Sequence, residues 1–83
     1  MKFTAEINVM PLKTLLDPQG KAVSASMGNV GLSEIKNVRI GKHITLQIEA
    51  DSKAIATTKV DEACKTMLCN QIMESYEFTL EEI

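Results

Sequence analysis

The sequence is poor in the residue types that most catalytic and nucleic-acid-binding sites use. It has two phenylalanines, one tyrosine, one histidine and no tryptophan. Its 9 basic and 11 acidic side chains give a net charge of −2 and are scattered along the chain. A nucleic-acid or acidic-membrane partner would require a basic cluster, so neither is expected. No apolar run approaches the roughly 20 residues that span a membrane.

The few reactive side chains do not form a recognisable site. His43 has no accompanying set of metal ligands, so a solvent-facing histidine is expected. Cys64 and Cys69 lie about 140° apart around a predicted helix and are predicted to be reduced thiols, Cys64 in the core and Cys69 near an edge. Glu81 and Glu82 are a paired carboxylate at a solvated chain end. No phosphate-binding loop or nucleophile motif is present. We expect no catalytic, metal or cofactor-binding residue in this chain.

The length of 83 residues predicts a single domain, 1–83, with a thin core. A domain of this size buries only about 60% of the surface that its unfolded chain exposes. Association with other chains is one way to bury more. The segment 1–6 lacks the apolar core of a signal peptide, so a cytoplasmic protein is expected.

Hydrophobic periodicity predicts a strand followed by a helix. Apolar residues alternate with polar ones over 3–9, and Pro11 ends this strand. Asp17 and Pro18 then form an N-cap and a first helical position, which predicts a helix over 18–30. Gly31 is the expected left-handed stop.

In the segment 35–49, the apolar residues from Val38 to Ile48 all fall on even positions, and this alternation continues unchanged across Gly41 and Lys42. A two-residue hairpin turn at 41–42 would put Ile44 on the opposite face from Ile40, which contradicts the pattern. Two structures remain possible, a three-residue loop at 41–43 or one long strand bent at Gly41. We favour the bent strand, with Lys42 at an inward position and a free edge that could pair with another chain.

The last third of the sequence predicts a helix and a strand. Thr58 is the expected N-cap after a polar connection over 51–58, and Asn70 the expected stop. Alternation over 76–80 predicts the last strand. The order β-α-β(β)-α-β indicates an α+β, ferredoxin-like sandwich, an antiparallel sheet with two helices on one face. The other face is expected to be polar or to meet a partner. The methionines, including Met67 and Met73, are expected to fill the core.

The run from Asp17 to Lys21 allows two interpretations. Backbone N–H groups at a helix start, close to Gly20 and Lys21, could hold a phosphate or carboxylate. Asp17 is itself an anion in that position, so simple capping is favoured. Arg39 and Lys42 would lie on opposite faces of a regular strand, so they form a poor joint clamp for a ligand unless the bend re-aims one of them.

Three motifs resemble those of the PurS family, the small subunit of phosphoribosylformylglycinamidine synthase. The runs that carry the resemblance are Asp17-Pro18-Gln19-Gly20-Lys21-Ala22-Val23, Val38-Arg39-Ile40-Gly41-Lys42 and Cys64…Leu68-Cys69-Asn70 followed by Ile72, Glu74 and Tyr76. They occur in the family's order and span nearly the whole chain. Gln71 stands where the family often has proline.

The resemblance implies a non-catalytic accessory subunit in de novo purine biosynthesis. The synthase amidates formylglycinamide ribonucleotide with ATP and with ammonia from glutamine. ATP and magnesium are then expected on a large synthetase subunit, and ammonia comes from a glutaminase subunit. The chain would bridge the two and associate with itself as a homodimer or a dimer of dimers. The expected interface residues are Asp17, Gln19, Lys21, Arg39, Gly41 and Lys42.

Two alternatives belong to other classes. A free-standing ferredoxin-like regulatory domain would bind a small metabolite between subunits, and would have a glycine-rich turn after the first strand. The chain has the segment 11–16 there, without glycine. A small enzyme using His43 or a cysteine ranks last. Architecture alone does not decide between these functions.

Overall fold

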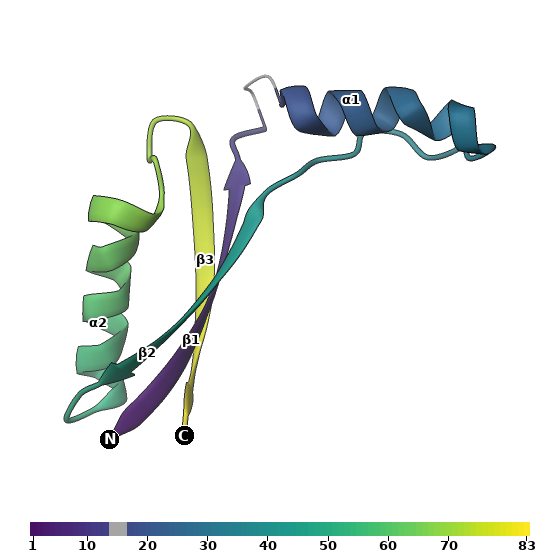
Figure 1. Ribbon diagram of the computed structural model, residues 1–83. Helices are drawn as coiled ribbons and strands as arrows, with labels where there is room; N and C mark the ends of the chain where they lie inside the picture. The colour runs from purple at the N-terminus through teal and green to yellow at the C-terminus, as the bar shows by residue number, and fades with distance from the viewer. Residues whose placement is uncertain (14–16) are drawn as a thin grey trace.

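Three antiparallel strands and two α-helices are the main elements of the computed structural model, which describes residues 1–13 and 17–83. The sheet has the strand order β2-β1-β3, with β1 at its centre. The predicted α+β class is confirmed (Figure 1). The elements are β1 (Lys2–Pro11), α1 (Pro18–Ser26), β2 (Lys42–Glu49), α2 (Lys53–Ala63) and β3 (Glu74–Glu82).

The core lies on one face of the sheet. The odd-numbered residues of β1 from Phe3 to Val9 are buried, as their alternation predicts. At the centre of the sheet, Ile7 pairs with Ile44 of β2 and Phe78 of β3. The opposite face presents polar side chains such as Glu6, because the side-chain period of a strand is two.

Helix α2 covers this apolar face. Ser52 caps the helix by accepting a hydrogen bond from Ile55 N at 3.2 Å, and Ala56 and Val60 are buried. The prediction of Thr58 as the cap was wrong, because its hydroxyl instead donates to Ala54 O inside the helix. Helix α2 continues into a π-helical turn, Cys64–Leu68. The helix therefore ends before Asn70, the predicted stop.

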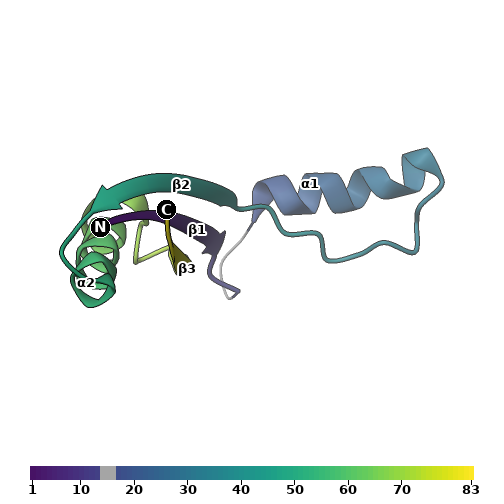
Figure 2. The same cartoon turned by 90° about the horizontal axis from the view of Figure 1, so that it is seen from below.

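Helix α1 lies beyond the end of the strands and extends to the side away from α2 (Figures 1 and 2). Asp17 is its N-cap, as predicted. A 3-10 turn, Met27–Val30, follows, and Gly31 ends it at φ +80°. The expected pair of helices is confirmed, but α2 alone packs on the sheet. The chain is consequently elongated, with a radius of gyration of 16.5 Å against the roughly 12 Å expected for its length.

The segment before β2 corrects the prediction for 35–49. β2 begins at Lys42, so residues 35–41 form neither a longer strand nor a hairpin. They run back along α1 (Figure 1), where Val38 N donates to Ser24 Oγ at 2.8 Å. Side-chain acceptors from α1 thus replace the strand pairing that the apolar alternation predicted. We call α1 and residues 27–37 the arm.

In the part of the chain that the structure describes, no helix is both long and apolar enough to cross a membrane.

Candidate functional site

The two sequence motifs of the first half of the chain meet at the junction between the arm and the sheet. The Asp17 carboxylate accepts hydrogen bonds from Gly20 N at 2.9 Å and from Ile40 N at 3.0 Å. The Gly20 bond, then the Ile40 bond and the nearby Arg39 charge, hold the Asp17 pKa below its ordinary value. The carboxylate therefore stays charged near neutral pH and ties the start of α1 to the segment before β2.

Two glycines allow the backbones to approach closely at this junction. A Cβ on Gly20 would meet the Val38 carbonyl oxygen, and one on Gly41 would meet the carbonyl oxygen of Val9. Neither contact leaves space for a methyl group. The glycine of each motif is thus explained by packing, since only glycine has no Cβ.

Arg39 adds a further contact at the junction: its guanidinium donates a hydrogen bond to the carbonyl oxygen of Pro11. Pro11 is the last residue of β1. These contacts favour the capping interpretation of the run from Asp17 to Lys21 over an anion site: Asp17 already takes the Gly20 N–H that an anion would need.

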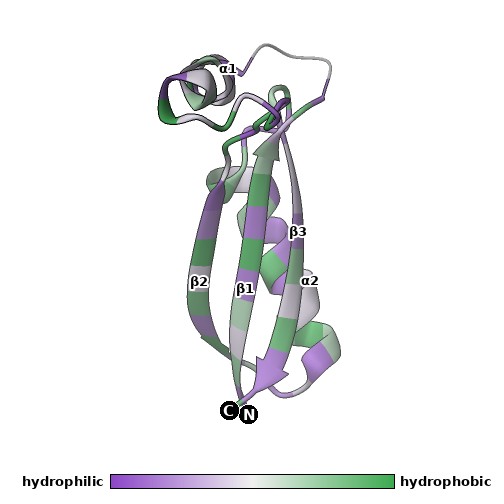
Figure 3. Cartoon of the chain, turned by 90° about the vertical axis from the view of Figure 1, so that its right-hand side faces the viewer, coloured by the Kyte–Doolittle hydropathy of each residue, from purple (hydrophilic) through white to green (hydrophobic). Residues whose placement is uncertain are grey.

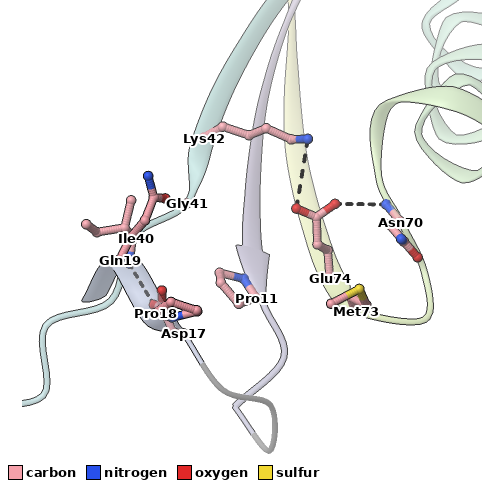
Figure 4. A pocket seen from close by; sticks show the side chains of 10 residues that line it. All are labelled: Pro11, Asp17, Pro18, Gln19, Ile40, Gly41, Lys42, Asn70, Met73 and Glu74. Atoms are coloured by element: carbon pink, nitrogen blue, oxygen red, sulfur yellow. Dashed lines mark hydrogen bonds and ion pairs between the residues drawn. The ribbon is translucent and has the colours of Figure 1, made fainter. Parts of the chain in front are cut away.

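A groove of about 430 Å³ lies beside the junction. Figure 4 shows it between the start of α1, the end of β1 and the connection from α2 to β3. Lys42 Nζ lies 3.8 Å from Glu74 Oε2, and Glu74 Oε1 accepts a hydrogen bond from Asn70 N at 2.9 Å. The lining residues are Pro11, Asp17, Pro18, Gln19, Ile40, Gly41, Lys42, Asn70, Met73 and Glu74.

Four of the six expected interface residues line this groove, namely Asp17, Gln19, Gly41 and Lys42. Lys21 is exposed on α1 outside the groove, and Arg39 is half-buried against β1. The structure therefore gathers most of the predicted set in one place. Their role as an interface stays a prediction.

The contribution of the α2–β3 connection to the groove does not follow from the sequence. The sequence indicates Asn70 only as a helix stop and Glu74 only as part of a motif. Asn70 O accepts from both Met73 N and Glu74 N, which folds the connection back toward the groove. An asparagine followed four residues later by a glutamate gives a weak local signal for such a turn.

Neither the two thiols nor the histidine is among the residues that line the groove. Cys64 and Cys69 are free and buried, and burial raises the pKa of both thiols, which disfavours the reactive thiolate. His43 is exposed, with Nδ1 2.6 Å from Asn8 Oδ1 and Nε2 4.0 Å from Glu6 Oε1. Across 1–13 and 17–83, no three His, Cys, Asp or Glu side chains are grouped as a metal site would need.

The described chain is an elongated, small α+β domain with an arm that does not pack on the sheet, a sheet covered by a helix on one face only, and a groove where arm and sheet join. A domain of this size buries a smaller share of its surface than a larger domain does. The sequence model of one family, PurS, described as phosphoribosylformylglycinamidine (FGAM) synthase, matches residues 4–82. The chain belongs to the PurS family.

Individual relatives agree over nearly the whole chain. The PurS subunit of phosphoribosylformylglycinamidine synthase from Synechocystis is 37% identical, over 94% of this chain and 78% of that protein. The crystal structure of Bacillus subtilis PurS has a TM-score of 0.86 at 33% identity, covering 96% of this chain and 99% of that one. A chain in the structure of PurLQS from Thermotoga maritima has a TM-score of 0.89 at 30% identity, covering 98% and 99%.

Proposed function

We propose that this chain is the small, non-catalytic subunit of phosphoribosylformylglycinamidine synthase and bridges its glutaminase and its large synthetase subunit. The reaction is the ATP- and glutamine-dependent amidation of formylglycinamide ribonucleotide, with ATP and magnesium held by the synthetase subunit. The similarity over the whole chain to subunits of that name carries this proposal. The match to a chain of PurLQS supports a place in a complex. These similarities do not favour a free-standing regulatory domain.

Self-association is part of the proposal, as a homodimer or a dimer of dimers. Helix α2 packs mainly over β1 and β3. The apolar side chains of β2 that face the same way, at Ile44, Leu46 and Ile48, are only partly buried. The arm meanwhile exposes Val30, Leu32 and Ile35. A second copy that covers these two areas would remove apolar surface from water in both chains, which favours association.

The groove is the surface that we assign to a larger subunit. Gln19 is exposed at its margin, and the Lys42 side chain is 53% exposed, so both can reach a partner. The ion pair between Lys42 and Glu74 is long and partly solvated, so little free energy opposes its exchange for a partner's carboxylate. Asp17 and Gly41 fix the segments that line the groove, Asp17 by its hydrogen bond from Ile40 N and Gly41 by its close approach to Val9.

The test is reconstitution from purified subunits with glutamine and Mg-ADP present. We expect the chain to co-elute with a glutaminase and a large synthetase, and to restore glutamine-dependent FGAM synthesis to them. Lys42→Glu should weaken assembly several-fold by reversing a charge in the groove. Lys21→Glu reverses an exposed charge outside the groove and is the matched control.

Failure of the wild-type chain to bind either larger subunit would refute the bridging role. Equal assembly of Lys42→Glu and Lys21→Glu would instead refute only the assignment of the groove.

A further inference from the structure

Three large apolar side chains stand exposed where α2 passes into β3. The exposed fractions are 84% for Met67, 83% for Ile72 and 54% for Met73. We call these three residues the knob. The prediction that Met67 and Met73 fill the core was wrong: Val60 of α2 and Cys64, the first residue of the π-helical turn, are buried in the core, whereas Met67 of the same turn is exposed.

The three knob residues lie on the π-helical turn and on the connection that follows it, and hydrogen bonds link these two segments. Gln71 Nε2 donates to Lys65 O at 3.2 Å, which brings the loop back onto the π-helical turn that carries Met67. Ile72 N donates to Asn70 Oδ1 at 3.1 Å, which fixes the turn that presents Ile72. Hydrogen bonds therefore hold the backbone that carries the exposed side chains of the knob.

The charge beside the knob argues against a second copy as its occupant. β3, the edge strand next to it, carries four glutamates, and residues 53–83 have six acidic and three basic side chains. Two copies meeting at this edge would bring like charges together, which costs free energy. β2 is the opposite edge of the sheet (Figure 3). Its only acidic residue is Glu49, and it also carries Lys42 and His43. These charges favour β2 and the arm, and not the knob, as the surface through which two copies associate.

We propose that the knob docks into a larger, non-identical subunit of the synthase, in an apolar pocket bordered by lysine or arginine side chains. This inference rests on the proposed function and names the partner-facing surface. The pocket's basic border would complement the glutamates of β3. Methionine is flexible and polarizable, which suits a pocket of a different protein. Met73 also lines the groove, so the knob adjoins the groove at this residue.

The test compares two pairs of exposed apolar residues. Met67→Ser with Ile72→Ser truncates the knob, and Val30→Ser with Leu32→Ser truncates the arm. Each purified variant is titrated against the glutaminase and against the synthetase, with glutamine and Mg-ADP present, and its own mass is measured by light scattering. We expect the knob variant to keep the wild-type mass and to bind one larger subunit about tenfold more weakly. The arm variant should lose self-association.

A salt series supplies a second readout. Binding of the wild-type chain to the larger subunit should weaken as sodium chloride rises from 50 to 500 mM, because exposed charges are screened. Glu77→Lys, an exposed reversal on β3, should reduce that salt dependence.

Two results overturn the inference while leaving the bridging role intact: a knob variant that binds within twofold of wild type, or one that loses self-association. A wild-type chain that binds neither larger subunit would instead refute the proposed function on which the inference rests.

Discussion

Replacement of Gly41 by alanine is the sharpest test of how the arm joins the sheet. The added Cβ would overlap the carbonyl oxygen of Val9 and the sulfur of Met10, and would lie 3.2 Å from the Met10 Cα. The methionine side chain can rotate away, but the backbone of β1 is fixed by its pairing on both sides. The segment before β2 must therefore move outward.

The loss of stability in Gly41→Ala comes only from the steric overlap of the added Cβ, because Gly41 does not adopt a positive φ that would itself disfavour alanine. Forcing an extra methyl group into a packed site costs about 1–3 kcal/mol. For a domain of this size, each kcal/mol lowers Tm by about 4–8 °C. We therefore expect Gly41→Ala to lower Tm by about 5–20 °C.

The assay is thermal unfolding followed by circular dichroism at one fixed protomer concentration, because the proposed self-association would make Tm concentration-dependent. Gly28→Ala is the matched control: nothing lies within 4 Å of its added Cβ, and a less flexible unfolded chain should raise stability by about 0.4–1 kcal/mol. A Gly41→Ala protein that melts within 2 °C of wild type would refute the close packing at the junction.

Two further predictions concern α2 and its connection to β3. The Tyr76 hydroxyl donates to Asp61, which raises the tyrosine pKa to about 12, so the stability it contributes is present below pH 10 and is lost between pH 10 and 12. Chemical denaturation across that range should show a steeper loss for wild type than for Tyr76→Phe, and parallel curves would exclude the contact. Cys64 and Cys69 should react with a thiol reagent only at the rate of unfolding, because both are buried with raised pKa values. Fast labelling of either thiol in the folded protein would contradict this burial.

Local sequence patterns correctly predicted the elements that have a regular strand alternation or a cap made by neighbouring residues. β1 and the centre of β3 follow from alternation, because one face of each is buried against α2. The start of α1 follows from Asp17 and Pro18, since capping uses neighbouring residues alone. Of the groove, the sequence predicted four lining residues as part of an interface, but not that a groove brings them together.

The errors arose where side chains compete for backbone groups over long sequence separations. The alternation over 35–41 indicates a strand, but Asp17 and Ser24 accept the N–H groups of Ile40 and Val38 instead. Ser52 and Thr58 are both of the residue types that cap helices, and the structure uses Ser52, which places Ala56 inside the helix on its buried face. Such choices depend on tertiary packing, which a single sequence does not show.

The junction explains why two motifs without catalytic groups have such specific compositions. Asp17 and Gly20 fix one side of it, and Gly41 fixes the other. The angle between arm and sheet is thereby set by hydrogen bonds and by backbone contact, rather than by a hydrophobic core. In the bridging subunit that we propose, that angle would determine how far the proposed self-association surface of the arm stands from the groove and the knob. A substitution that loosens the junction should therefore impair assembly with the larger subunits even where every residue that touches them is unchanged.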